Sequence, residues 1–318
     1  MVMRDWMITH EWMVKYTPQT EWIERRGILV WIAEVFTALG AGLYLVALYF
    51  DSLVGMFIAW LIIVVLKIPL HMAYFGKPLR FWRTVPPFTN AWKTSWFSRG
   101  ITFTVLFTGF GFIPLLFLFS PSALVISSWL PGIGWEVAEI AFKVLAGIIA
   151  FLVGIYSGFI MNYCRSVPFW NSALLPLVFI FCSIADGFAL IMAIALAGGQ
   201  VDIMAAEAGS RVLLIISALI MATYLWSATY TSSTAKQSVI ELIRGKIALI
   251  FWIGIVALGI IIPLAISAAS YFAGEASVPL LITAITCHTI GAFALKYCLL
   301  KAGIHNPVLP TISSTRAA

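Results

Sequence analysis

Charged side chains are scarce in this chain, and their scarcity excludes most soluble proteins. Lys, Arg, Asp and Glu make up 10% of its 318 residues, while 62% of the residues are hydrophobic. The mean hydropathy is +1.02. A soluble domain of this size cannot bury so much apolar surface, whereas a lipid bilayer accepts it. The sequence therefore predicts a membrane protein.

Cysteine and histidine are also scarce, with four of each. The cysteines show no CxxC spacing, which argues against an iron–sulfur or disulfide framework. Only His71 and His288 lie within long apolar runs, and helical rise separates their depths by roughly 13 Å, too far to hold one haem iron. We therefore expect no haem, no iron–sulfur cluster and no metal site in this protein.

Eight long apolar runs are the main feature that is present. Each has about 20 residues, enough to cross a hydrocarbon core of ~30 Å as a helix. The predicted spans cover residues 27–50, 53–75, 100–119, 139–162, 173–197, 210–231, 247–272 and 278–301. The expected fold is all-α and polytopic, with eight transmembrane helices in a domain of residues 27–301. An amphipathic, Trp-rich interfacial segment (1–26), or alternatively a partner contact strip, precedes it, and a tail (302–318) follows.

The few charges divide by side of the membrane. Most of the 19 Lys and Arg residues fall on the side of the N-terminus, whereas the opposite side is acidic. Because Lys and Arg in short loops set orientation, both termini are predicted to be cytoplasmic. The pI near 9.2 then reflects topology and contact with anionic membrane lipid, not binding of nucleic acid.

One cytoplasmic loop, residues 76–99, has five cations, no acid and several interleaved aromatic residues. Such a loop is either a positively charged flank with an aromatic belt or a docking platform for a soluble partner. It is longer and more aromatic than topology requires, which favours docking. The docking candidates are Lys77, Arg80, Arg83, Lys93, Trp96 and Arg99.

Ionisable residues inside the early spans are candidates for function, because burying them in a membrane is costly. Glu34 and Lys67 lie at similar depths, ~10 and ~12 Å by helical rise, and are expected to pair. His71 lies one turn from Lys67 on the same helical face. Tyr156 reaches a similar depth, and Tyr163 lies at the end of its span. The group is either a structural ion pair or a pocket for a lipid-soluble redox ligand such as a quinone.

Three further ionisable residues lie in the spans. Asp186 is close to mid-membrane, where it is either part of a proton path or a partner in a helix–helix hydrogen bond. Lys143 and Lys296 lie near the ends of their spans, and we expect both to extend to the membrane surface.

Several motifs carry a family resemblance over nearly the whole chain. Together they resemble the NrfD/PsrC family, the polysulfide reductase-type membrane subunits of iron–sulfur molybdoenzymes. The motifs are ALGAG (38–42), FGKPLRFWR (75–83), SWFSRG (95–100) and GAFALKYCLLKAG (291–303).

The resemblance implies an eight-helix, haem-free anchor in a prokaryotic cytoplasmic membrane. Its partners would be a four-cluster ferredoxin-like iron–sulfur subunit and a molybdopterin or tungstopterin catalytic subunit. A site for menaquinone or ubiquinone would lie under the docked ferredoxin-like subunit, and it maps onto Glu34, Lys67, His71, Tyr156 and Tyr163.

The sequence departs from the family pattern at one point. An Asp usually precedes the Leu-Gly-Arg/Lys-Pro turn, whereas this sequence reads Tyr-Phe-Gly-Lys-Pro over residues 74–78. We therefore take Glu34, with His71, as the candidate catalytic residues that handle protons.

The charge map adds that the catalytic partner would act in the cytoplasm, for example on a coenzyme A thioester. An anchor of the phenylacetyl-CoA:acceptor oxidoreductase type is the specific hypothesis. One rival is a secondary transporter, which would show an inverted repeat; none is visible, since polar residues concentrate in spans 1–5 and spans 6–8 look nearly bare. The other rival is a purely structural anchor with no quinone site.

Overall fold

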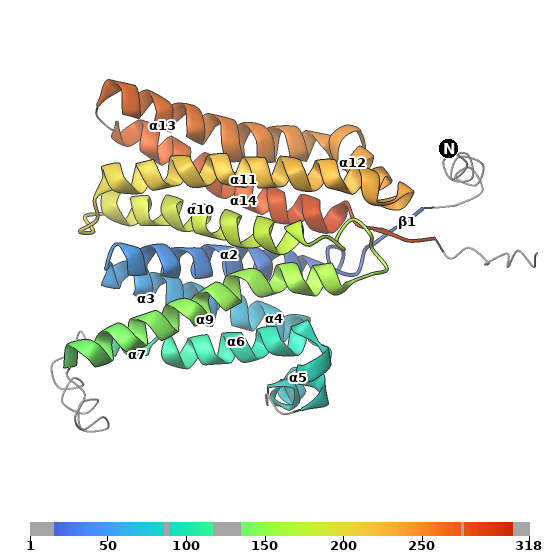
Figure 1. Ribbon diagram of the computed structural model, residues 1–318, viewed down its shortest axis with the longest axis horizontal. Coiled ribbons are helices and arrows are strands. Elements are labelled where there is room, and N and C mark those ends of the chain that lie inside the picture. Colours follow the sequence, from blue (N-terminus) through green and yellow to red (C-terminus); the bar gives the residue numbers. More distant parts are fainter. Residues whose placement is uncertain (1–15, 86–88, 117–134, 275–276, 308–318) are drawn as a thin grey trace, which may run out of the picture.

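The computed structural model describes residues 16–85, 89–116, 135–274 and 277–307. The predictions for most of the N-terminal segment and for the end of the C-terminal tail lie outside these ranges. Figure 1 shows long helices lying side by side along one axis. Eight of the described helical segments are long and apolar enough to cross a membrane. The predicted all-α, eight-span membrane fold is thereby confirmed.

The spans are built from twelve of the described elements. Spans 1 to 4 are α2 (Gly27–Tyr49); α3 (Leu53–Leu61), η2 (Ile62–Lys67) and α4 (Ile68–Tyr74); α6 (Trp96–Phe110) and α7 (Ile113–Leu116); and α9 (Trp135–Tyr163). Spans 5 to 8 are α10 (Leu174–Leu196); α11 (Ile203–Thr231); η4 (Ile250–Ile261) and α13 (Ile262–Ala273); and α14 (Val278–Lys301). The connections contain η3 (Pro78–Thr84), α5 (Asn90–Thr94) and α12 (Ser233–Arg244).

The largest difference from the predicted boundaries is at span 6. Helix α11 begins at Ile203 rather than at residue 210, because Asp202 caps it. The Asp202 carboxylate accepts the N–H groups of Met204 (2.9 Å) and Ala205 (3.1 Å). Glu207 interrupts the apolar run but is buried inside the fold. Hydropathy therefore made this span look shorter than it is.

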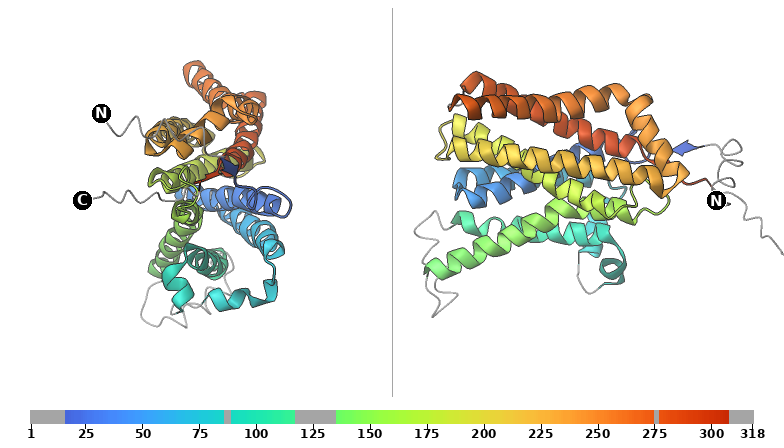
Figure 2. Two further views of the ribbon diagram at one scale, coloured as in Figure 1. Left: turned by 90° about the vertical axis from the view of Figure 1, so that its right-hand side faces the viewer. Right: turned by 45° about the horizontal axis from the view of Figure 1, so that its top comes forward.

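Spans 1–4 and spans 5–8 form two bundles that lie next to each other (Figure 2). They meet where α2 packs on α10. A Cβ atom on Gly42 would collide with the Ser183 carbonyl, and one on Gly187 would collide with the Gly42 backbone. The absence of side chains at these two positions lets the helix backbones touch, as small residues do in membrane helix pairs.

Two spans contain a π-helix directly before a proline. Segment η2 is followed by Pro69, and η4 by Pro263, each the second residue of the α-helix that comes next. Proline has no N–H to donate to the preceding turn, so the helix changes its hydrogen-bond register there. A third proline of the spans, Pro114, is the second residue of α7, which follows α6 after a short interruption.

The two ends of the described structure are joined. Strand β1 (Thr17–Pro18) pairs antiparallel with β2 (Ile304–His305). This clip lies at the end of the molecule that holds the first residue of α2 and the last of α14 (Figure 1). We call that end the near side and the opposite end the far side.

Candidate functional site

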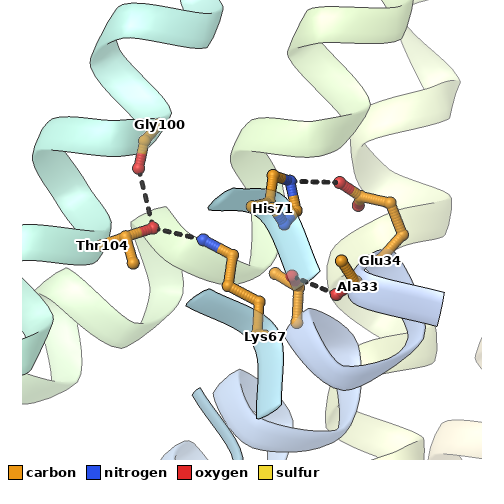
Figure 3. Close-up of polar contacts among 7 residues, drawn as sticks. Ala33, Glu34, Lys67, His71, Gly100 and Thr104 are labelled. Atoms are coloured by element: carbon orange, nitrogen blue, oxygen red, sulfur yellow. Dashed lines mark hydrogen bonds and ion pairs between the residues drawn. The ribbon is translucent and has the colours of Figure 1, made fainter. Parts of the chain in front are cut away.

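Figure 3 shows that three predicted residues, Glu34, Lys67 and His71, lie close together in the half of the membrane domain next to the near side. Their similar depths in the sequence predicted this cluster. Glu34 Oε1 lies 3.8 Å from His71 Nε2, so the ion pair of Glu34 is with the imidazole and not with the expected Lys67. Lys67 turns to α6 instead and donates to Thr104 Oγ1 at 2.6 Å. That hydroxyl in turn donates to the Gly100 carbonyl at 2.9 Å.

The two predicted tyrosines lie in different surroundings. Tyr156 is 3% exposed, and its ring centre lies 5.3 Å from the Lys67 ammonium in a cation–π contact. The ring fits against α6 because a Cβ atom at Gly100 would occupy its position. Tyr163 is 60% exposed and lines neither of the cavities described next. The structure thus brings Tyr156 into the cluster and leaves Tyr163 outside it.

Two cavities meet at His71. The first has a volume of about 700 Å³ and the second about 560 Å³. His71 and Phe97 line both. The first also contains Glu34, Ser157, Trp22 and Tyr74 in its walls. The second also contains Lys67, Thr104, Tyr156 and Phe81. Most of the remaining wall is aliphatic, so polar groups converge from one side on an apolar space.

Three buried polar atoms of the first cavity have no hydrogen-bond partner within the described residues. They are Glu34 Oε2, His71 Nδ1 and Ser157 Oγ. Leaving such an atom unsatisfied costs about 1–3 kcal/mol. An acid, an imidazole and a hydroxyl that face one cavity without partners are typical of a site that receives a polar ligand group.

The residues of the predicted docking loop divide into two groups. Lys77, Arg80, Arg83 and Lys93 are exposed on the near side. Trp96 stacks on Phe159 with ring centres 4.3 Å apart. Arg99 packs over Trp96 and donates to the carbonyls of Trp92 (3.0 Å) and Lys93 (2.8 Å). Trp96 and Arg99 therefore hold the loop in shape, whereas the four exposed cations are available to a partner.

Asp186 has a partner that sequence reasoning missed. His288 Nε2 lies 2.9 Å from Asp186 Oδ1, and His288 Nδ1 lies 3.1 Å from the Gly259 carbonyl oxygen. The sequence contained one indication of this contact: Asp186 and His288 both lie near the middle of their spans and therefore at a similar depth in the membrane.

The second bundle is richer in buried ionisable groups than predicted. Lys296 is 2% exposed and lies 3.5 Å from the centre of the Phe179 ring, so the prediction that it extends to the membrane surface was wrong. Glu207 is also 2% exposed. Spans 6–8 are therefore not bare. Lys143 behaves differently, since it pairs with Asp51 (2.6 Å) and Glu139 (2.8 Å) at the far side.

Together these features define a class: a multi-pass, eight-helix membrane protein with a buried acid–histidine–lysine cluster and an apolar cavity at one end. The sequence matches the family described as "Polysulphide reductase, NrfD" over residues 26–307. The chain belongs to this family, which confirms the resemblance carried by its motifs.

Two relatives illustrate the match. The sequence is 24% identical to protein NrfD of Escherichia coli (strain K12) over 255 residues, which cover 76% of this protein and 79% of that relative. It is 25% identical to the C subunit of the polysulfide reductase of Wolinella succinogenes over 243 residues, which cover 71% of this protein and 74% of that subunit.

Proposed function

We propose that this protein is the quinone-reactive, haem-free membrane anchor of a multi-subunit oxidoreductase. The observation that carries the proposal is the first cavity, where unpartnered atoms of Glu34, His71 and Ser157 face an otherwise apolar space. Membership of the polysulphide reductase NrfD family supports a role in such a complex.

A quinone, menaquinone or ubiquinone, suits the residues present. When bound, it supplies a lipid-soluble carrier of two electrons and two protons. Its ring and tail need apolar walls, which the two cavities provide, and its carbonyl oxygens need donors. Lys67 and His71 are the donors on one side of this space, and Tyr156 packs behind Lys67.

Glu34 and His71 are the proton-handling pair in this proposal. The imidazole lies between the Glu34 carboxylate and the second cavity, because it lines both cavities. A carboxylate that faces an imidazole can accept a proton from it and return it. Thr104 and Gly100 act as positioning residues, since they fix the direction of the Lys67 ammonium.

The exposed cations of the loop after span 2 are the proposed docking surface. Lys77, Arg80, Arg83 and Lys93 would receive a four-cluster ferredoxin-like iron–sulfur subunit, which passes electrons between quinone and a molybdopterin or tungstopterin catalytic subunit. The relative from Wolinella succinogenes is by its name one subunit of a polysulfide reductase. The excess of Lys and Arg on this side supports a cytoplasmic position for this face and for both termini.

A cytoplasmic catalytic partner suits a substrate that cannot cross the membrane, such as a coenzyme A thioester. Within that class we propose an anchor of the phenylacetyl-CoA:acceptor oxidoreductase type.

The test is co-purification of the tagged protein in mild detergent, with metal analysis, quinone extraction and mass spectrometry of the associated proteins. We expect an iron–sulfur subunit, iron, molybdenum or tungsten, and quinone in the same peak. A protein that is folded and monodisperse but carries neither partner nor quinone contradicts the proposal. That result would favour the alternative function, a secondary transporter. A complete complex without quinone supports the purely structural anchor instead.

A further inference from the structure

Glu207 is a buried acid of the second bundle that the proposed quinone site does not use. It follows Ile203, the first residue of α11, by about one helical turn, which puts it roughly 6 Å from the far-side end of that helix. The residue is 2% exposed. Burying an ionisable group in a membrane helix is costly unless it has a partner or a function.

Neither protonation state of this acid is satisfied by the residues that the structure describes. Both carboxyl oxygens of Glu207 are without a hydrogen-bond partner there. A carboxylate needs donors or a cation, whereas a protonated carboxyl needs an acceptor for its O–H. The species that completes this group therefore has to reach it through the adjoining cavity.

The cavity beside Glu207 has a volume of about 290 Å³. Helices α10, α11, α13 and α14 surround it, and its other polar walls are Ser210, Ser267 and His288. Both serines are buried. Pockets for small organic molecules have volumes of about 300–1,000 Å³, so this one suits an ion or water.

The available ligand atoms are oxygens. His288 is already engaged, because its Nδ1 lies 3.1 Å from the Gly259 carbonyl oxygen and its Nε2 lies 2.9 Å from Asp186 Oδ1. What remains is one carboxylate and two hydroxyls. Hard cations take oxygen ligands, whereas softer transition metals prefer imidazole or thiolate. The donor set therefore fits a hard cation.

The charges around the cavity favour a single positive charge on that cation. Glu207 supplies one negative charge. Arg211, one turn further along α11, donates from Nε to Ser267 Oγ at 3.1 Å, and its guanidinium lies 4.7 Å from the centre of the Tyr271 ring. A divalent ion would place two more positive charges near this guanidinium with one carboxylate to balance them. A monovalent ion balances Glu207 alone.

We propose that Glu207, Ser210 and Ser267 bind a sodium ion in this cavity. The carboxylate supplies the charge, the hydroxyls supply further oxygen ligands, and water completes the coordination. The ion links α11, which contains Glu207 and Ser210, to α13, which contains Ser267. The inference goes beyond the proposed function, because this cavity shares no wall residue with the two cavities at His71.

The test measures binding of radioactive sodium to the full-length protein in detergent, with choline chloride holding the ionic strength constant. We expect saturable binding that Glu207→Gln abolishes and that Ser210→Ala weakens by about tenfold through loss of one oxygen ligand. Glu139→Gln is the matched control, since that far-side carboxylate pairs with Lys143 outside the cavity. Sodium chloride should also raise the unfolding temperature of the wild type, but not that of the Glu207→Gln variant, above the value in choline chloride.

Each outcome decides for or against the sodium site. Wild-type protein without saturable binding overturns it and leaves water or a proton as the occupant. Binding that survives Glu207→Gln but is lost in Glu34→Gln places the ion in the first bundle and also overturns it.

Two further variants decide if Glu207→Gln is not monodisperse by size exclusion. Weaker sodium binding in both Ser210→Ala and Ser267→Ala supports the site, and unchanged affinity in both overturns it. Failure here leaves the quinone proposal untouched, because co-purification of quinone and partners is a separate measurement.

Discussion

The two bundles each contain a histidine that faces a carboxylate, and the two pairs differ in their separation and in the backbone contact of the histidine. His71 and Glu34 are 3.8 Å apart, and each has an unpartnered atom beside a cavity of about 700 Å³. His288 and Asp186 are 2.9 Å apart, and the second ring nitrogen contacts the Gly259 carbonyl. Both pairs keep an unpartnered imidazole nitrogen within the described residues, but only in the second pair does a backbone carbonyl hold the other ring nitrogen.

A π-helix followed by a proline lies next to both histidine–carboxylate pairs, but it has a different effect in each span. In span 2 the π-helix ends at Lys67, whose side chain points to Thr104 and leaves His71 to Glu34. In span 7 the proline after the π-helix leaves a carbonyl available for a neighbouring helix. The comparison shows that a π-helix followed by a proline ends at a buried lysine in one span and leaves a carbonyl in contact with a histidine of another helix in the other.

The largest expected effect comes from Glu34→Gln. In the purified complex we expect quinone-linked turnover to fall by about 10²-fold or more, because the amide cannot exchange a proton with His71. The amount of co-purified partner should stay unchanged. Turnover within a factor of about two of wild type, in an intact complex, would remove Glu34 from the mechanism.

The second effect separates the two pairs by stability. Asp186→Asn should lower the free energy of unfolding by about 1–3 kcal/mol, because it replaces a charged partner in a buried contact. Glu34→Gln should lower it by less than about 0.5 kcal/mol, because that carboxylate has no close hydrogen bond to lose. Thermal unfolding in detergent, followed by circular dichroism, measures both. Equal losses would show that the pairs are equivalent.

A smaller effect is expected from Lys67→Met, which keeps the packing of the side chain and removes its ammonium. Quinone affinity should fall by about tenfold through loss of one charged donor. Quenching of tryptophan fluorescence by a short-tailed quinone analogue provides the measurement. Thr104→Val is the companion variant: it leaves the ammonium in place without its positioning partner, so a smaller loss is expected. Unchanged affinity in both variants would place the quinone elsewhere.

The smallest of the expected effects is the change that Pro263→Ala causes in the free energy of unfolding. Alanine restores an N–H that competes with His288 for the Gly259 carbonyl, so the change in stability should be under about 1 kcal/mol in either direction. Thermal unfolding in detergent, followed by circular dichroism, measures this change. A variant that unfolds well below wild type would indicate that Pro263 supports packing and not the histidine contact.

The sequence predicted well how deep in the membrane each residue lies. It predicted poorly whether a side chain points toward lipid or toward a neighbouring helix. Apolar runs located all eight spans, and helical rise put Glu34 and Lys67 at similar depths with His71 one turn away. Depth alone does not distinguish the side of a helix that faces lipid from the side that faces protein. Lys296 was misjudged for that reason, since it is buried against an aromatic ring.

The pairing of residues from distant spans was the other limit. Asp186 and His288 are 102 positions apart (288 − 186), and a single sequence contains no signal that α10 and α14 are neighbours. Asp202 is a recognisable helix cap in the sequence. The start of span 6 was nevertheless predicted too late, because Glu207 and Ser210 lower the hydropathy of the residues that follow the cap. Their burial follows from helix packing, which a sliding window does not describe.

The clip between β1 and β2 has a consequence for biosynthesis. Trp22 and Leu300 both line the first cavity, and Gln19 holds this wall together by donating to the carbonyls of Leu300 and Gly303 at 2.8 Å each. Because a polypeptide is made from its N-terminus, the wall is complete only after the eighth span has left the ribosome. A polypeptide that stops before Gly303 cannot close it, so a complete near face marks a finished subunit.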